Sequence, residues 1–314
     1  MATDIVFYPH AIRQTTIAGG TEGLILTLLD DVVPSHNFQD LTSYCAAQPG
    51  PQQTGSHMAS PDCRFTTPQL ATLLFSLNTG PYGICRSYAD SNVDVWYRAG
   101  ENLGMRVAKN ASAHLRLRMQ ANALLALESI DFEEGANAVG RCRLVSVIGP
   151  NGQDPLVPTA GVALEGLATG GRLHTMGPIR VNGTLLKGAS GGRLENNLVY
   201  DEESSHGEGF LSYVGIKTIT PRLTVRSRKT DYMALFGNKG TPLSSLEFYL
   251  RSKLASGINE ADAAAFHIKI TATVGTIKAR QVMGDKAHCE LTIDLQQPGE
   301  DQPPYTIAVN QAIT

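Results

Sequence analysis

The segment VDVWYR at residues 93–98 has a counterpart in LEFYLR at residues 246–251. In both, an apolar residue, an acid, an apolar residue, an aromatic residue, an apolar residue and an arginine follow in that order, 153 residues apart. At the same spacing, without a gap, AHLRLRM at residues 113–119 corresponds to FHIKITA at residues 266–272. Repetition at a fixed spacing indicates a duplicated structural unit.

The correspondence continues on both sides of these segments. With six fewer residues in the second copy, RCRLVSVI at residues 141–148 matches HCELTIDL at residues 288–295, and a cysteine then occupies the same place in both. Upstream, TTPQLATLLF at residues 66–75 matches SRKTDYMALF at residues 227–236 more loosely. We therefore interpret the chain as one module written twice.

Each copy is predicted to consist mostly of strands. In residues 114–120 and 288–295, apolar and polar residues alternate with a period of two, and one face is charged in each. Such alternation is typical of half-buried antiparallel strands. Only one helix is expected in each copy. The first is predicted from Pro68 to Ser76 with Thr67 as its cap, and the second from Lys229 to Phe236, closed by Gly237.

The predicted fold class is mainly β, with two tandem β-sandwich or barrel modules that each carry one short flanking helix. We place the first module at residues 1–166 and the second at residues 167–314, with the boundary in the glycine-rich segment GLATGGR at residues 166–172. The first has fifteen acidic and ten basic residues, a net charge of −5, and the second has fourteen acidic and sixteen basic residues, a net charge of +2. Opposite charges allow the two modules to alternate around a ring.

Composition excludes several classes of protein. The chain has 314 residues, 42% hydrophobic and 18% charged, with a net charge of −3, so no overall basic field attracts nucleic acid. Five cysteines without CxxC spacing predict reduced thiols rather than a disulfide framework or a zinc site. The N-terminal residues lack the pattern of a signal peptide, and the apolar stretches are far shorter than the ~20 residues of a membrane helix. We expect a soluble protein made in the cytoplasm, without a membrane partner.

Two pairs of matching residues are candidates for chemistry. His114 and His267 each begin a strand beside a cation, with no acid close in sequence. We interpret them as structural residues bonded to a backbone or neighbouring-subunit group; a catalytic or metal-binding role is the alternative. Cys142 and Cys289 alternate with charged residues, which favours small core side chains over nucleophiles.

Three further segments lack the patterns of binding sites. The acidic run at residues 201–208 lacks the carboxylate spacing of a calcium loop, and the glycines of residues 166–177 lack a P-loop ending. The basic segment RLTVRSRK at residues 222–229 has no interleaved aromatic residues, so we expect it to complement an acidic neighbouring surface rather than to bind nucleic acid. The aromatic residues at matching strand positions are interpreted as packing residues: Trp96, Tyr97, Phe248 and Tyr249. No catalytic, cofactor-binding or metal-binding set results, and the chain is predicted not to be an enzyme.

The second copy resembles a known family. The resemblance runs through VNGTLLKGAS at residues 181–190, SYVGIKTITPRLTVRS at residues 212–227, LEFYLR, and HIKITATVGTI at residues 267–277, to the Ala312–Ile313 ending. On this ordered succession of segments, the chain resembles the tail tube proteins of long-tailed bacteriophages.

The resemblance implies a structural role in a virion tail, after synthesis in the cytoplasm of a bacterial host. Tail tube proteins have a β-sandwich-like core with one helix, and their strands join into a continuous inner barrel of stacked rings. A chain with two modules would form a homotrimer with six pseudo-equivalent modules. Its partners would be further copies of itself, a tape-measure protein and DNA passing through the lumen without specific binding during DNA ejection, and other tail proteins at the tube ends.

The sequence leaves other functions open. One alternative is a distal tail or other adaptor ring built from the same module, and another, of a different class, is a soluble glycan-binding or hydrolytic β protein. Two long segments favour assembly, because residues 32–54 and 188–209 are predicted as long loops, which are unusual in a compact monomer. Their similar places in the two copies predict arms that become ordered against neighbouring subunits or rings.

Overall fold

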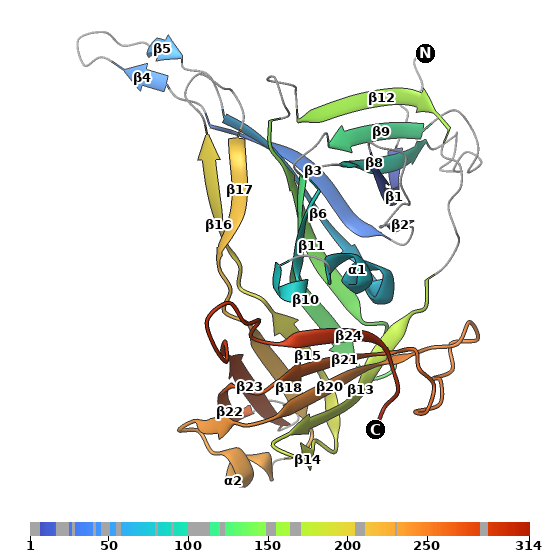
Figure 1. Ribbon diagram of the computed structural model, residues 1–314, viewed down its shortest axis with the longest axis vertical. Helices are drawn as coiled ribbons and strands as arrows, with labels where there is room; N and C mark the ends of the chain where they lie inside the picture. Colours follow the sequence, from blue (N-terminus) through green and yellow to red (C-terminus); the bar gives the residue numbers. More distant parts are fainter. Residues whose placement is uncertain are drawn as a thin grey trace.

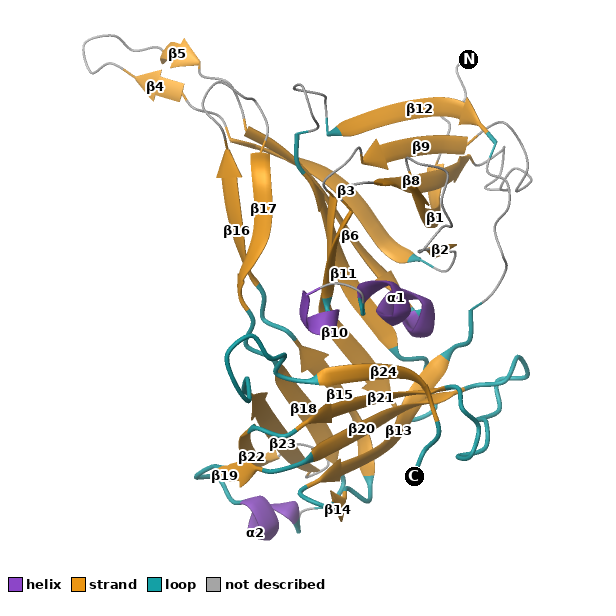
Figure 2. Ribbon diagram, in the orientation of Figure 1, coloured by secondary structure: helices purple, strands orange, loops and turns teal. Residues whose placement is uncertain are grey.

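The computed structural model places most of the chain in antiparallel β-structure, with two short α-helices (Figures 1 and 2). The residues that it describes are 7–16, 25–26, 29–39, 42–44, 51–54, 58–78, 81–88, 91–99, 114–119, 123–148, 155–163, 171–204, 211–229, 231–282 and 288–314. The fold is therefore mainly β, as predicted. The predicted module boundary at residue 166 lies outside the described residues.

The first half of the chain contains twelve of the strands. They are β1 (Phe7–Thr16), β2 (Ile25–Leu26), β3 (Asp30–Gln39), β4 (Thr42–Tyr44), β5 (Pro51–Thr54), β6 (Met58–Thr67), β7 (Cys85–Tyr88), β8 (Ser91–Ala99), β9 (His114–Met119), β10 (Ala123–Glu133), β11 (Val139–Ser146) and β12 (Leu156–Val162). Helix α1 (Leu70–Leu77) and a short 3-10 turn, η1 (Pro81–Gly83), lie between β6 and β7.

The second half contains the remaining strands and helix α2 (Tyr232–Phe236). These strands are β13 (His174–Val181), β14 (Thr184–Leu185), β15 (Ala189–Glu195), β16 (Val199–Ser204), β17 (Leu211–Thr218), β18 (Arg222–Ser227), β19 (Thr241–Leu243), β20 (Leu246–Ser252), β21 (His267–Ala272), β22 (Gly275–Val282), β23 (His288–Leu295) and β24 (Thr306–Gln311).

Three larger sheets organise these strands. One five-stranded sheet has the order β12–β9–β8–β1–β2, and another has the order β14–β13–β20–β21–β24. A ten-stranded sheet runs β19–β22–β23–β18–β15–β10–β11–β6–β3, with β7 also pairing with β10. Figure 2 shows the two five-stranded sheets toward opposite ends of the molecule, with the ten-stranded sheet running between them. Two hairpins, β4–β5 and β16–β17, form separate two-stranded sheets.

The strand orders of the two halves correspond. The order β12–β9–β8–β1–β2 has the same sequence of connections as β24–β21–β20–β13–β14. Within the ten-stranded sheet, β7–β10–β11–β6–β3 corresponds in the same way to β19–β22–β23–β18–β15. The matching segments found in sequence, VDVWYR and LEFYLR, lie in β8 and β20, which occupy equal places in these orders.

One hydrophobic cluster contains side chains from all three larger sheets. Among its fully buried members are Ile12 and Val95 from the first sheet, Phe248 from the second, and Phe65 and Leu291 from the ten-stranded sheet. Burying apolar area is the main favourable term in folding. The alternation predicted for residues 288–295 is confirmed, because every second residue of β23, from Cys289 to Leu295, is buried.

The alternation predicted for residues 114–120 is only partly present. Leu115 and Leu117 pack against the core while remaining partly exposed, and Met119 is buried. The opposite face is not a solvated charged face, because Arg118 donates two hydrogen bonds, of 2.7 and 2.8 Å, to the buried carboxylate of Asp94. Gln120 lies outside the described residues.

Both predicted helices are present but shorter than expected. Helix α1 runs from Leu70 to Leu77, and its N-cap is Gln69 rather than the predicted Thr67. The Thr67 hydroxyl instead accepts from the Gln69 backbone N–H (3.1 Å) in the turn ahead of the helix. Helix α2 begins at Tyr232 rather than Lys229. Gly237 ends it as predicted, with a φ of 65° that suits glycine. The 3-10 turn η1 was not predicted.

The two segments predicted as long loops are mainly strands instead. The first contains β4, β5 and most of β3, and the second contains β15 and β16. Each belongs to a long hairpin whose distal part is a separate two-stranded sheet, which we call the first arm (β4–β5) and the second arm (β16–β17). Figure 1 shows the first arm projecting away from the rest of the molecule. No helix in the described part of the chain is long and apolar enough to cross a membrane.

Candidate functional site

The two halves of the molecule are joined by direct strand pairing, which we call the joint. Residues Ser129–Glu133 of β10 pair antiparallel with Gly191–Glu195 of β15. The preceding residues of β10, Ala123–Ala126, pair with β7 instead. The joint thus connects one edge of the sheet in the first half to a different edge in the second half, and it makes the ten-stranded sheet continuous.

Asn196, directly after β15, forms a polar bridge within the joint. A bulge in β10 between Leu127 and Ser129 interrupts its register with β11. The fully buried Asn196 fills this place: its backbone N–H donates to the Glu128 carbonyl (2.9 Å), and its Nδ2 donates to the Leu127 carbonyl (2.7 Å). Its Oδ1 accepts from the Tyr305 hydroxyl (2.6 Å), whose pKa is raised by burial. Buried polar groups satisfied in this way specify one arrangement of the chain.

Replacing Asn196 by alanine is expected to destabilise the folded chain by about 3 kcal/mol, because the Leu127 carbonyl and the Tyr305 hydroxyl then stay buried without this partner. Urea unfolding followed by circular dichroism measures the change. Asn259→Ala, at an exposed position, serves as the matched control and should change the free energy of unfolding by less than about 0.5 kcal/mol. Equal destabilisation by both substitutions would show that Asn196 does not hold the joint.

Aromatic packing crosses the joint on the core side of the sheet. Phe132 of β10 meets Phe248 of β20 with ring centroids 4.5 Å apart. The Phe132 ring lies over Gly192 of β15, where an added Cβ would be 2.8 Å from the ring and 2.1 Å from the Thr224 carbonyl oxygen. Only glycine fits at this position. Glycine therefore lies in β15 where the aromatic ring of Phe132 covers the strand.

The turn between β10 and β11 extends the joint toward β13. The Thr175 hydroxyl donates to the Glu133 carbonyl (3.1 Å), and the Ala138 N–H donates to the His174 carbonyl (2.7 Å). Lys253 Nζ donates to the Gly135 carbonyl (2.9 Å) and to Asn137 Oδ1 (3.0 Å). These bonds connect the turn of the first half to the second half at positions beyond the paired strands.

A buried histidine lies next to this turn. His174 is fully buried, and its Nε2 donates to the Phe266 carbonyl (3.2 Å). Burial lowers its pKa below the ordinary value of 6.5, and nearby His267 acts in the same direction, whereas Glu260 opposes it. The charged group closest in sequence, Arg172, is ion-paired with Glu260. His174 is therefore neutral in the folded protein at neutral pH.

The stability of the chain should depend on this group below neutral pH. Because the folded-state pKa is depressed, the contribution is present above about pH 6.5 and is lost as the pH falls toward the folded-state value. Urea midpoints measured from about pH 7.5 down to about pH 5 should fall more steeply for the natural chain than for His174→Gln. Parallel curves for the two chains would contradict the assignment.

The second arm lies on the face of the ten-stranded sheet opposite the main core. Its side chains Tyr200, Val214 and Ile216, with the preceding Leu198, pack against a small cluster in the first half. That cluster consists of Cys85, Leu124 and Ala126 from β7 and β10. The backbone adds a bond from the Ile148 N–H to the Leu211 carbonyl (2.8 Å). The second arm thus covers an apolar patch of the first half.

Arg143 of β11 anchors the second arm through charge. Arg143 is 6% exposed, and its guanidinium donates from Nε to the Asp62 carboxylate (2.8 Å) and from Nη2 to Glu202 of the arm (3.0 Å). It also lies 4.3 Å from the ring centroid of Tyr200, and burial raises the pKa of that tyrosine. Removing one member of a buried ion pair leaves an uncompensated charge, so the arrangement favours a docked arm.

Replacing Glu202 by alanine should loosen the second arm and expose Cys85 beneath it. Burial raises the pKa of Cys85 to about 11 and hides its thiol, so it should react slowly in the natural chain. In a Cys45→Ser background, we expect Glu202→Ala to speed the reaction of Cys85 with a thiol reagent at least about tenfold, as the arm opens more often. Glu203→Ala, at the neighbouring exposed position, should leave the rate unchanged. Identical rates in all three chains would show that the Arg143–Glu202 pair does not hold the arm.

Two edges of the ten-stranded sheet lack a full partner strand among the described residues. Strand β3 pairs with β6 on one side, and β22 pairs with β19 only over Gly275–Ile277. In the described part of the chain, no strand pairs with the other side of β3. On the outer side of β22, no strand pairs beyond Ile277, although the Ala279 N–H donates to the Gly237 carbonyl (2.8 Å). These strands occupy the same places in the two strand orders as β15 and β10, which pair with each other in the joint.

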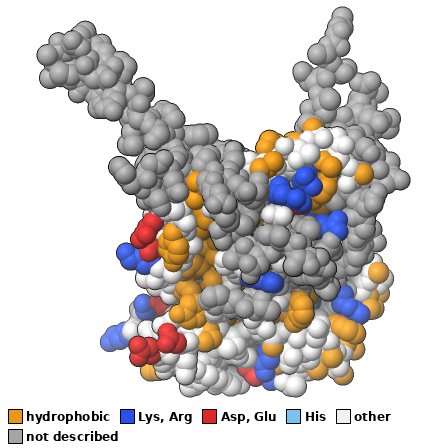
Figure 3. Space-filling view, turned by 45° about the horizontal axis from the view of Figure 1, so that its top comes forward, with side chains coloured by type: hydrophobic (Ala, Val, Ile, Leu, Met, Phe, Trp, Pro, Cys, Tyr) orange, Lys and Arg blue, Asp and Glu red, His pale blue; other side chains and the backbone are white. Residues whose placement is uncertain are grey.

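A charged groove of about 490 Å³ opens on the second half. Two of its carboxylates contact a cation on a neighbouring strand: Asp294 accepts from Arg222 (2.7 Å) and Glu290 from Arg280 (2.7 Å). Lys278 lies 3.6 Å from Asp294, and Asn238 lines the groove from the turn after α2. Figure 3 likewise shows acidic and basic side chains next to one another on the side of the molecule that it presents. Exposed pairs of this kind contribute little to stability.

The histidines singled out in sequence are buried in the structure. His267 accepts at Nδ1 from the Ser252 N–H (2.9 Å) and donates from Nε2 to the Ala261 carbonyl (3.0 Å), so both ring nitrogens bond to backbone. His114 packs edge-on against Trp96, with ring centroids 6.4 Å apart. Within the described ranges, no group of three or more His, Cys, Asp or Glu side chains is arranged to hold a metal ion.

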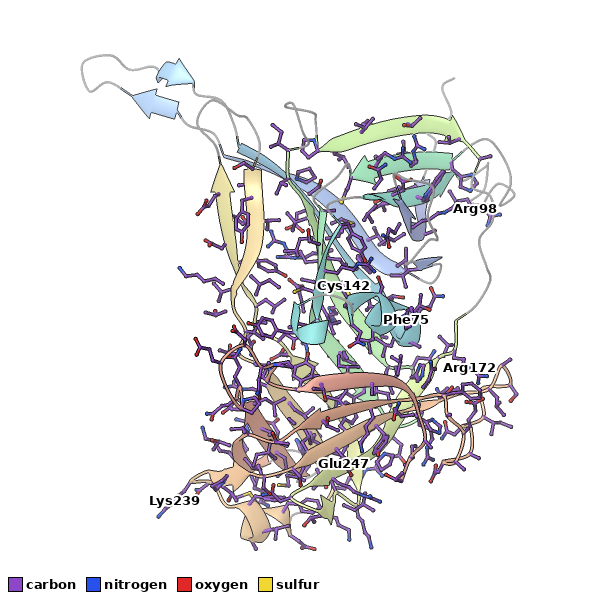
Figure 4. All side chains as sticks on the ribbon, viewed as in Figure 1. Phe75, Arg98, Cys142, Arg172, Lys239 and Glu247 are labelled. Atoms are coloured by element: carbon purple, nitrogen blue, oxygen red, sulfur yellow. The ribbon has the colours of Figure 1, made fainter. Side chains whose placement is uncertain are left out.

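The remaining candidates occupy packing or surface positions. Cys142, labelled in Figure 4, and Cys289 are fully buried, and burial raises the pKa of both thiols. Burial also places the four matching aromatic residues in packing positions: Trp96, Tyr97, Phe248 and Tyr249. Of the acidic run at residues 201–208, residues 201–204 belong to β16 and the others lie outside the described residues.

The glycine-rich and basic segments also lie in strands or near them. Of residues 166–177, only 171–177 are described, and β13 begins at His174. Residues 222–227 form β18, with Arg222 and Arg226 exposed, and the alternation stops at Ser227. The acidic complement of Arg222 is Asp294 of the same chain, where the sequence predicted a neighbouring surface.

The sequence patterns did not indicate the residues of the joint or the arginine that anchors the second arm. Asn196 and Gly192 lie in a segment that resembles a loop, and Arg143 is one of several strand arginines. The one available signal for Arg143 was its position beside the repeated cysteine. Comparison with known proteins adds no family, because no family model and no curated protein matches this chain. The described part of the chain is a β-rich fold in which β3 and part of β22 have no strand on one side.

Proposed function

We propose that this chain is a structural subunit of a bacteriophage tail tube, built from a duplicated tube module, and that it acts by assembly rather than by catalysis. One observation supports this most directly. The joint pairs β10 with β15, and within the described residues the strands at the equivalent places, β22 and β3, each have a stretch of one side that no strand pairs with.

A second copy can use these edges in the way that the chain uses its own. If β3 of one chain pairs with β22 of the next, each new contact repeats the internal joint and adds two modules to the sheet. Such a head-to-tail contact between different surfaces forms a closed ring when the rotation per module divides a full turn. Closure also removes the open edges, which would otherwise promote unspecific pairing.

The ring size and location follow from the resemblance to tail tube proteins. Six modules per ring correspond to three chains, and stacked rings form a channel for DNA in the virion tail. The tape-measure protein and DNA would occupy the lumen, and other tail proteins would bind the tube ends. The opposite net charges of residues 1–166 and 167–314, −5 and +2, favour alternation of the modules around the ring.

Mass measurements over a range of protein concentrations test the proposal. The purified chain should give masses that are multiples of three chains, and the particles should grow with concentration. A chain that stays monomeric at high concentration would overturn the assembly proposal. Copy number in virions then separates a tube subunit, with many tens of chains, from an adaptor ring with a handful.

A further inference from the structure

The two arms occupy equal places in the chain but have different surroundings. The second arm rises from the β15–β18 hairpin and lies on the first half, as described above. The first arm rises from the β3–β6 hairpin, and Figure 1 shows it extending away from the body. The strand registers show which surface of the second half corresponds to the surface beneath the docked second arm.

The registers of the two halves can be counted from the repeated cysteines. Cys142 and Cys289 are followed by Arg143 and Glu290. Arg143 pairs with Ala126 on one side and Arg64 on the other. Glu290 pairs in the same way with Arg280 and Arg226. In the second half, Arg280 is therefore equivalent to Ala126, which lies beneath the second arm. Lys278, two residues before Arg280, is equivalent to Leu124.

The arms themselves are in the same register. Glu195 pairs with Arg222 at the base of the second arm, and Asn37 pairs with Ser60 at the base of the first. In the second arm, Tyr200 lies five residues after Glu195 and pairs with Ile216, which lies six residues before Arg222. The same count leads to the pair Thr42–Thr54 in the first arm. The two hairpins are therefore in the same register.

The surface that the count identifies is the charged groove. Lys278, Arg280, Glu290 and Thr224 line it, and these are the register equivalents of Leu124, Ala126, Arg143 and Asp62 at the docked second arm. We infer that this groove is the docking site for the first arm of a second copy of the chain. The inference rests on the assembly proposed above, and it assigns a partner to a surface that the chain does not cover itself.

The polarity of each arm agrees with the surface assigned to it. The second arm is apolar where it meets Cys85, Leu124 and Ala126. The first arm, in sequence DLTSYCAAQPGPQQT at residues 40–54, has three glutamines, one acid and no lysine or arginine. Amide and hydroxyl groups can bond to both the cations and the carboxylates of a mixed groove. The inferred contact would thus be polar on both sides, whereas the contact of the second arm with Cys85, Leu124 and Ala126 is apolar on both sides.

Engineered disulfides test the docking in the assembled protein. In a Cys45→Ser background, Thr54→Cys is combined with Lys278→Cys, the register equivalent of Leu124. The described natural cysteines are all buried, so they should not compete. On mild oxidation of assembled rings, we expect covalently linked trimers on a non-reducing gel. Mixing the two single-cysteine chains should give linked dimers, which shows that the bond forms between copies.

The control pair places the second cysteine at Ser256, an exposed residue of the loop between β20 and β21. Figure 4 shows Arg172 and Lys239 on opposite sides of the molecule. The Arg172 guanidinium stacks on Phe266 of the β20–β21 loop, whereas Lys239 is next to the groove residue Asn238. If electron microscopy shows rings but the Lys278→Cys chain links no better than the Ser256→Cys chain, the proposed docking site is wrong, while the assembly proposal still holds. Absence of any assembly by the natural chain would overturn both.

Discussion

A chain with Gly192 replaced by alanine is expected to lose about 3 kcal/mol or more of folding free energy. The new Cβ would be 2.1 Å from the Thr224 carbonyl oxygen, and a backbone atom in the middle of a sheet cannot move aside as a flexible side chain can. Relief requires β15 to separate from β18 or Phe132 to leave its place against Phe248. Overpacking of a closed interior usually costs 1–3 kcal/mol, and a clash with backbone belongs at or above the top of this range, about 3 kcal/mol.

Urea unfolding compares this variant with a matched glycine. Gly299 lies in a turn where an added Cβ would make only ordinary contacts, 3.5 Å or longer, so Gly299→Ala should be nearly neutral. Because Gly192 lies at the joint, its variant should also show earlier loss of contact between the halves, detected as faster proteolysis near the β10–β11 turn. A Gly192→Ala chain as stable as Gly299→Ala would show that β15 does not pack beneath Phe132 as described.

Deleting residues 40–54, which contain the first arm, is expected to abolish polymerisation while both halves stay folded. The first arm pairs only within itself among the described strands, so its removal takes no strand pairing from either five-stranded sheet. The natural chain should elute as a large assembly and the deleted chain as a monomer with an unchanged far-ultraviolet spectrum. Because surface hairpins tolerate shortening, folding itself should survive.

Two outcomes of this deletion would contradict the expectation in different ways. Loss of the folded monomer would show that the arm supports the fold. Normal polymerisation without the arm would show that the open edges alone assemble the rings. As a comparison, shortening the tip of the second arm at residues 205–210 removes none of its described contacts with Arg143 or Cys85 and should leave assembly intact.

Sequence patterns predicted the local structure well where alternation or repetition was strong. The alternating residues of β23, the glycine end of α2 and the repeated segments of β8 and β20 all lie in the elements expected for them. These features depend on neighbours in sequence, which is the information that periodicity carries. The same patterns placed two long loops where the structure has strands, because β15 contains consecutive glycines and the hairpins are polar.

The joint could not be predicted in this way, because it depends on pairing between distant residues. Ser129 and Glu195 are opposite each other only after the bulge at Leu127 has shifted the register of β10. Asn196 acquires its partners from β10 and from Tyr305 at the far end of the chain. Strand register is set by the packing of whole faces and not by any single residue. For this reason, the sequence predicted modules but not how they connect.

The pairing of β3 with β22 of the next chain is tested most directly by electron cryomicroscopy of the concentrated natural protein. We expect rings of three chains with a pseudo-sixfold outline that stack into tubes, in which the contact between chains repeats the β10–β15 joint. At a resolution that separates strands, the sheet should run without a break from one chain into the next. Particles that remain single chains, or rings whose chains meet through other surfaces with β3 still open, would contradict it.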